Sequence, residues 1–220
     1  MTLSEIKTEI KSRAKTQCFN EALQAALAAS SEDDLIVAGL TAVEWAYQAG
    51  IVDDALLSEF TEEKLNAAGI YTTGAYEIND PETDVYLIKE AVGVITVTGT
   101  LKARIIMMGS AKGELTISGN SHALVNQYDE SELEILQLGD SIVNLETRDR
   151  ASTVVDLQDG SLIHVEARGK SQVSLTLSDD TSALAFMYQN SNLIYTLEDN
   201  GSIKYEQVDS SNVINATPET

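Results

Sequence analysis

The chain has 220 residues, of which 43% are apolar, so it can bury one large hydrophobic core or two small ones. Its 35 acidic and 14 basic residues give a net charge of −21, which repels phosphate backbones and anionic lipids and disfavours nucleic-acid and membrane-surface binding. The start of the chain lacks the apolar stretch of a signal peptide, no eighteen apolar residues run together, and the one cysteine, Cys18, suits a reducing compartment. The expected location is therefore the cytoplasm.

The first 70 residues have helical periodicity and predict a small α-helical bundle. Thr2-Leu-Ser-Glu5 has the pattern of a capping box, in which the first and fourth side chains each bond the other residue's backbone N–H. The first helix is expected to follow this box. The later ones are expected over Glu21–Ala29 (with Asn20 as N-cap), Leu35–Ala49 (ended by Gly50), Asp54–Phe60 and Thr61–Ala68.

Beyond residues 71–84, which are polar and predict a linker, the helical period gives way to the period of two that is typical of strands. From Ala91 to Ser210 the chain divides into twelve successive decapeptides without insertion or deletion. The third, fifth and seventh positions of these units contain no Asp, Glu, Lys or Arg, whereas the even positions are mostly polar. The ninth position is Gly or Asp in eleven of the twelve units, and both residues favour tight turns. Each unit is therefore expected to be a strand followed by a corner.

These features predict a mainly β protein: a parallel β-solenoid over residues 85–208, preceded by the α-helical domain of residues 1–70 and followed by a polar tail over residues 209–220. An up-and-down antiparallel sheet is the alternative, but its turns usually differ between the two ends, whereas these corners are uniform. A three-sided coil is preferred to a two-sided one, because residues thirty apart, such as Leu115, Leu145 and Leu175, then form homogeneous columns. The same ten-residue step is also compatible with three chains wound around one axis.

On a three-sided coil one outer face carries apolar side chains and is the candidate contact surface. Such a face can pack against the N-terminal helices, against a second copy of the chain (a trimer included), or against a separate protein partner. Its residues are Val94, Leu124, Tyr128, Val154, Leu184, Phe186 and Tyr188.

The segment Leu65-Asn-Ala-Ala-Gly-Ile-Tyr-Thr-Thr-Gly74 is followed by short strands whose corners read Gly119-Asn-Ser121, Asp159-Gly-Ser161 and Gln189-Asn-Ser191. In these features the chain resembles uncharacterised proteins of gut bacteria and their phages, which carry Asn-Ser/Thr-Val-like strand repeats behind a helical head. The resemblance covers most of the chain, although the repeats here are diverse rather than near-identical. It implies an accessory or phage-associated structural role, and it brings no catalytic residues.

The sequence predicts no catalytic, cofactor-binding or metal site, because the common hydrolase, zinc and nucleotide motifs are missing. His122 and His164 are expected on different faces of the coil, which argues against a shared metal. Asp149, Asp179 and Asp209 are expected to stack at one corner and are candidate oxygen ligands for calcium, although Asp is also an ordinary turn residue.

The leading expectation is therefore a non-enzymatic structural or interaction protein, associated with a phage or another mobile element and needing no cofactor. One alternative is a glycan-binding or glycan-cleaving β-helix, in which paired outward carboxylates act on a sugar chain. The outward basic and aromatic residues that such a groove needs are scattered along the coil. The other alternative is a calcium-stabilised adhesive roll.

Overall fold

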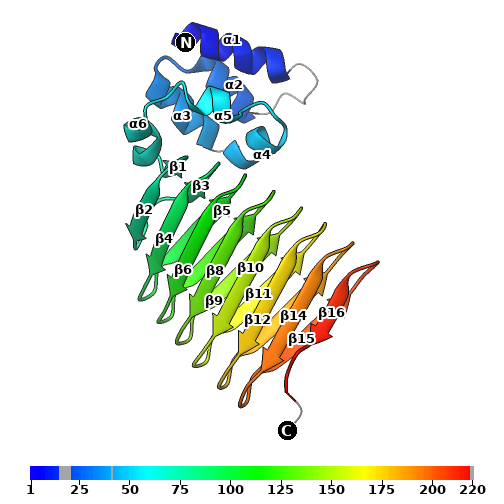
Figure 1. The fold of residues 1–220 in the computed structure, drawn as a ribbon. Helices are drawn as coiled ribbons and strands as arrows, with labels where there is room; N and C mark the ends of the chain where they lie inside the picture. The colour runs from blue at the N-terminus through cyan, green and yellow to red at the C-terminus, as the bar shows by residue number, and fades with distance from the viewer. Residues whose placement is uncertain (15–20, 41, 219–220) are drawn as a thin grey trace. The chain divides into compact units, whose positions relative to one another are not determined.

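The computed structural model describes residues 1–14, 21–40 and 42–218 of the chain. The chain divides into two units, Met1–Ile70 and Tyr71–Thr220, and each unit has a buried core of its own. The first unit is helical and the second is a stack of strands (Figure 1). Cys18 and the expected cap Asn20 lie outside the described residues.

The first unit consists of short helices around an apolar core. The predicted capping box is present: Thr2 N–H donates to Glu5 Oε2 at 2.7 Å, and Glu5 N–H donates to Thr2 Oγ1 at 3.4 Å. Ile6, Ile10 and Leu35 are among the buried core residues. The helices are α1 (Leu3–Arg13), α2 (Glu21–Ala28), α3 (Glu32–Leu40), α4 (Val43–Gln48), α5 (Asp54–Leu57) and α6 (Glu62–Ala67).

The single helix expected over residues 35–49 is wrong, because the chain turns between α3 and α4. Ala42 has φ −147° and ψ 22°, which lie outside the helical region, so it precedes α4 as its N-cap instead of continuing α3. Its N–H donates to the carbonyl of Gly39, three residues back, at 3.0 Å, as in a tight turn. Gly39 lies in the last turn of α3, and glycine is a poor helix former.

The second unit is a parallel β-solenoid, as predicted, and consists of two eight-stranded sheets. All the strand pairs described are parallel, so the antiparallel alternative is wrong. Sheet A contains β1 (Ile70–Tyr71), β3 (Val85–Leu87), β5 (Lys102–Met107), β7 (His122–Gln127), β9 (Ile142–Thr147), β11 (Leu162–Ala167), β13 (Ser182–Met187) and β15 (Ser202–Gln207). Sheet B contains β2 (Ala75–Asn79), β4 (Val92–Val97), β6 (Lys112–Ile117), β8 (Glu132–Gln137), β10 (Ser152–Leu157), β12 (Gln172–Leu177), β14 (Asn192–Leu197) and β16 (Asn212–Asn215).

Two strands make one coil, so the expected three-sided coil is wrong. Val155 pairs with Leu175 in sheet B, and Leu145 pairs with Val165 in sheet A, in each case twenty residues apart. Leu145 therefore lies in the sheet opposite Leu175 and not in one column with it. The space between two packed sheets is about 10 Å, which one layer of Val, Leu or Ile side chains from each sheet fills.

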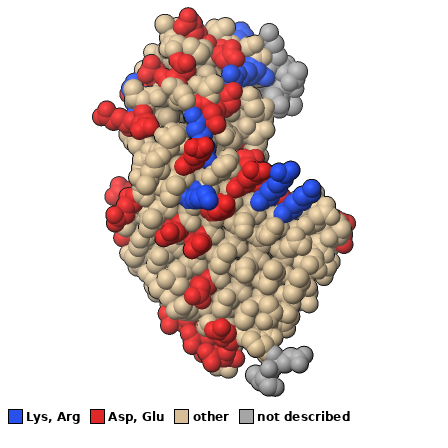
Figure 2. Space-filling view, in the orientation of Figure 1, with Lys and Arg blue, Asp and Glu red and all other residues tan. Residues whose placement is uncertain are grey.

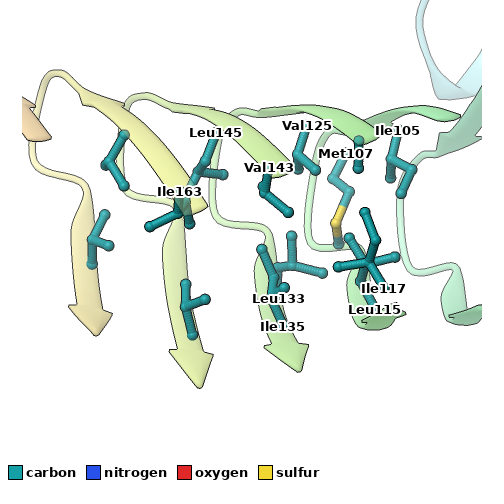
Figure 3. Close-up of a cluster of buried hydrophobic side chains, with 14 of the residues drawn as sticks. Ile105, Met107, Leu115, Ile117, Val125, Leu133, Ile135, Val143, Leu145 and Ile163 are labelled. Carbon is teal, nitrogen blue, oxygen red and sulfur yellow. The ribbon is translucent and has the colours of Figure 1, made fainter. Parts of the chain in front are cut away.

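The interior of the solenoid is a continuous apolar layer between the sheets. Figure 3 shows Val143 and Leu145 of sheet A pointing toward Leu133 and Ile135 of sheet B. All four side chains are at most 3% exposed. The absence of charged residues from the third, fifth and seventh positions thus reflects a dry interior that runs through successive coils.

Both segments expected to flank the solenoid contribute strands to it. β2 lies within the expected linker, and its Ile78, 8% exposed, pairs with Ile95 of β4. β16 lies within the expected polar tail, and its Val213 pairs with Leu193 of β14. Each of these short strands continues an interior column with one apolar side chain, although its neighbours in the sequence are mostly polar.

A polar network inside the coil ties successive corners together. The side-chain amide of Gln127, which is fully buried, donates to the carbonyls of Ser131 at 2.8 Å and Ser152 at 2.9 Å. Gln127 Oε1 accepts a hydrogen bond from Thr153 Oγ1 at 2.6 Å. Gln137 repeats the two amide bonds ten residues later. These glutamines satisfy buried carbonyl groups where the chain leaves one sheet for the other.

Candidate functional site

The seven residues of the predicted contact surface do not form one surface, because they lie on both sheets. Val94 and Val154 project from sheet B and are 44% and 52% exposed. The prediction failed because residues thirty apart alternate between the sheets when a coil contains twenty. It also included Tyr128, which is only 2% exposed. The five residues on the sheet A side are Leu124, Tyr128, Leu184, Phe186 and Tyr188.

The outward side chains form two faces that differ in charge. Face A comprises the second, fourth, sixth and eighth positions of the units that contain β5 to β15 of sheet A, and face B the same positions of the units that contain β4 to β14 of sheet B. Face A has five basic and three acidic residues, a net charge of +2, whereas face B has one basic and five acidic residues, a net charge of −4. Figure 2 shows acidic side chains spread over the visible surface and basic ones gathered in a few places. Face A therefore has a positive balance within a chain of net charge −21.

Two arginines on face A are each held by hydrogen bonds to the glutamate two residues earlier in the sequence. Arg148 Nε donates to Glu146 Oε1 at 2.6 Å, and Arg168 Nε donates to Glu166 Oε1 at 2.7 Å. Nη2 of each arginine donates to the same oxygen. Burial acts to lower the pKa of Arg148, but the hydrogen bond to Glu146 and the attraction of nearby negative charges, that of Glu146 foremost, together outweigh it, so the pKa is raised above its ordinary value. The hydrogen bonds hold both guanidinium groups in one orientation.

Each of these arginines also lies against a tyrosine one coil away. The Arg148 guanidinium is 5.8 Å from the centre of the Tyr128 ring, and that of Arg168 is 4.7 Å from the centre of the Tyr188 ring. Both distances are within the range of cation–π interactions. The eighth positions of four successive coils thus read Tyr, Arg, Arg, Tyr along face A. Tyr128 is buried, so of the two rings only that of Tyr188 is partly accessible to a partner.

The two histidines lie on the same sheet, contrary to the prediction. His122 is in β7 and His164 is in β11, with β9 between them. His122 Nε2 lies 2.6 Å from Nδ2 of Asn144 in β9, so this imidazole contacts a side-chain amide of the neighbouring strand. Across residues 1–14, 21–40 and 42–218, no group of three or more His, Cys, Asp or Glu is placed to hold a metal ion.

The acidic corners bond backbone N–H groups and do not form the expected stack of three. Asp149 and Asp209 follow strands of sheet A, whereas Asp179 follows a strand of sheet B. Successive corners on one side are linked instead: Asp159 Oδ2 accepts from Gly139 N–H at 3.1 Å, and Asp179 Oδ2 accepts from Asp159 N–H at 3.3 Å. These carboxylates therefore satisfy turn donors of the preceding coil.

A shallow groove of about 450 Å³ lies on face B. Glu114 and Glu134 line it from the same position of the adjacent strands β6 and β8. The ion pair between Lys112 Nζ and Glu132 Oε2, 2.8 Å apart, lies beside them. Adjacent strands are about 4.8 Å apart, so Glu114 and Glu134 bring two carboxylates close together on the outside of the coil.

Comparisons of the chain with protein-family models, with curated proteins and with solved structures find no match. None of the helices described is long and apolar enough to cross a membrane.

Sequence reasoning missed the arrangement of Arg148 and Arg168, which it treated as scattered outward residues. The signal was present as a spacing of twenty: Glu-x-Arg recurs at 146–148 and 166–168, and a tyrosine lies twenty residues before the first arginine and twenty after the second. A coil length of twenty makes each of these pairs neighbours on one face. A coil length of thirty separates them.

Proposed function

We propose that the protein is a non-enzymatic structural or interaction protein that presents the solenoid as a rigid surface for a protein partner or for its own copies. The setting we propose is the cytoplasm or a virion, as part of a phage or another mobile element. The observation that carries the proposal is face A, where charged, aromatic and aliphatic side chains are displayed at regular spacing on a rigid sheet. An exposed surface that combines arginine and aromatic residues is typical of protein contact sites.

The chemistry of the polar groups supports this proposal. The carboxylates of Glu146 and Glu166 hold arginines, and those of Asp159 and Asp179 hold turn N–H groups. Each is thus committed to an internal bond of the kind that orders a surface. Such order reduces the conformational entropy that side chains lose when a partner binds.

Site-specific photo-crosslinking of the full chain tests the proposal. A photoreactive residue replaces Leu184 on face A in one variant and Ser174 on face B in a matched variant, and both are expressed in the native host. We expect one discrete cross-linked protein, identified by mass spectrometry, from the Leu184 variant, and its loss when Arg168→Glu is added. Cross-linking of equal strength and identity from both faces would contradict a contact surface on face A.

A glycan-binding or glycan-cleaving protein is the second candidate function, because the groove on face B brings Glu114 and Glu134 together. Retaining glycosidases place their two carboxyl groups about 5–5.5 Å apart, which neighbouring strands can provide. Release of reducing sugar from a polysaccharide panel tests this function. Turnover that Glu114→Gln abolishes, with Glu198→Gln outside the groove on face B as the matched control, would replace the structural role by an enzymatic one.

A further inference from the structure

Two columns of opposite charge run side by side on face A. The sixth positions carry Glu146 and Glu166, and the eighth positions carry Arg148 and Arg168, in the two adjacent coils that contain β9 and β11. The side chains of Arg148 and Arg168 are each 42% exposed, and those of Glu146 and Glu166 are 26% and 41% exposed. Both columns are therefore ordered by internal bonds and still accessible from outside.

The next coil continues the two columns with aromatic residues. Phe186 occupies the sixth position and Tyr188 the eighth, and both are partly exposed. The combined patch thus has two charged coils and one aromatic coil in sequence. Positions two residues apart on a strand lie about 7 Å apart, and stacked sheets pack about 10 Å apart, so long side chains can meet across a pair of such patches.

The two columns are complementary to themselves under one symmetry operation. A two-fold axis that runs along the stacking direction, between the columns and in the plane of the contact, exchanges the sixth positions of one copy with the eighth positions of the other. Each glutamate then faces an arginine of the second copy in the same coil, and Phe186 faces Tyr188. An axis along the strands would instead place glutamate against glutamate. The charge pattern therefore selects the first arrangement.

We propose that face A mediates a two-fold homodimer in which the two solenoids run parallel, with Glu146 and Glu166 paired to Arg148 and Arg168 of the second copy. This inference depends on the proposed function, because it takes the solenoid surface as a contact surface and names the partner. Two copies that approach through face B bring net charges of −4 together, whereas the balance on face A is +2 and its opposite charges are aligned. The contact is isologous and closes at two subunits.

Sedimentation velocity of the full chain over a range of concentrations tests the dimer. The variant Arg148→Glu with Arg168→Glu makes both columns acidic, and Glu146→Arg with Glu166→Arg makes both basic. We expect each to weaken dimerisation at least about tenfold, which corresponds to about 1.4 kcal/mol. A control with Arg150→Glu and Lys170→Glu makes the same change in net charge at the corners, and we expect it to dimerise like the native chain.

The decisive variant carries all four face A substitutions, which exchange the columns and keep them complementary. We expect it to dimerise again, and we expect a mixture of the all-acidic and all-basic variants to form a one-to-one heterodimer. A native chain that stays monomeric, or a dimer that none of the substitutions weakens, would overturn the inference. If the chain is monomeric and Leu184 still cross-links to a host protein, the dimer is wrong and the proposed contact function stands. If a glycan is hydrolysed, the proposed function is wrong whatever the oligomeric state.

Discussion

Replacement of Asp159 separates the two contributions of a ninth-position residue at a corner: its left-handed backbone and its side-chain hydrogen bond. Asp159 has φ 61°, in the left-handed region, and its Oδ2 accepts from Gly139 N–H at 3.1 Å. Alanine keeps the left-handed backbone, which costs about 1–2 kcal/mol without a compensating side-chain bond, and it loses a hydrogen bond worth about 0.5–1.5 kcal/mol. Because aspartate already bears part of the backbone cost, we expect Asp159→Ala to lower the free energy of unfolding by about 1–2 kcal/mol.

Glycine at the same position loses the hydrogen bond but adopts the left-handed backbone freely. Its greater freedom in the unfolded chain costs about 0.5–1 kcal/mol. We therefore expect Asp159→Gly to be more stable than Asp159→Ala, with a net change within about 0.5 kcal/mol of the native chain. Gly139 and Gly119, one and two coils earlier at this corner, have φ 66° and 74° and illustrate the same solution.

Urea unfolding followed by circular dichroism measures both variants. A difference of 1 kcal/mol corresponds to about 2–4 °C in Tm for a protein of this size, so thermal melting provides a second measurement. Ser174, in the middle of β12, serves as the control position, where Ser174→Ala should be more stable than Ser174→Gly. If alanine is the more stable substitution at both positions, the left-handed backbone and the hydrogen bond at the corner contribute less to the free energy of unfolding than we infer.

Three further predictions concern the interior, the helical unit and the coil length. Thr153→Val leaves the buried Gln127 Oε1 without its donor, so we expect a loss of about 1–3 kcal/mol in urea unfolding, most of which Thr153→Ser should recover. In the helical unit, the hydrogen bond from Arg13 lowers the pKa of Asp53. The resulting stabilisation is complete when the pH is above the pKa of the unfolded chain, about 3.9, and is lost as the pH falls through the lower pKa of the folded state. Fluorescence of Trp45, the one tryptophan, should report this acid unfolding, and Asp53→Asn should be less stable at pH 7 with a flatter acid profile. Deletion of residues 131–150 removes one whole coil and should leave a solenoid that melts cooperatively. Deletion of residues 141–150 removes fewer residues but moves every later unit to the opposite sheet, so we expect it to lower Tm by more.

The ten-residue repeat was predictable because one physical condition acts on every unit. Inward positions face a dry interior and exclude charge, and ninth positions adopt a left-handed backbone that Gly and Asp tolerate. Asp129, Asp149, Asp159, Asp179, Asp199 and Asp209, and Gly99, Gly109, Gly119, Gly139 and Gly169, all have positive φ. The sequence pattern therefore predicted both the strand and the corner of each unit.

The number of strands per coil was not predictable from the inward columns, because Leu, Ile and Val at the same position fit either arrangement. Leu115 stacks with Ile135 in the structure, and nothing in their apolar character distinguishes this neighbour from Leu145. Outward pairs are more selective, since opposite charges one coil apart attract each other. Lys112 and Glu132 form such a pair across twenty residues. The corner residues add the same signal, because Gly99, Gly119 and Gly139 follow one another at intervals of twenty.

The error in coil length explains why the predicted contact surface failed while the prediction of a solenoid succeeded. If the assumed coil length is wrong by ten residues, every inward side chain is still predicted to point inward. The pattern of the core is therefore the same for either coil length. The same error moves an outward side chain to the opposite face, so it mixes the +2 surface with the −4 surface.

Each face is therefore encoded by every second decapeptide, and its residues can change without affecting the other face. The shared interior requires only apolar or internally bonded side chains at three positions of each unit. An evolving chain can thus keep one rigid frame while it alters the charge of one side. Paired Glu–Arg columns occur on face A, with no matching columns on face B among the residues described, which agrees with the proposal that face A is the contact surface.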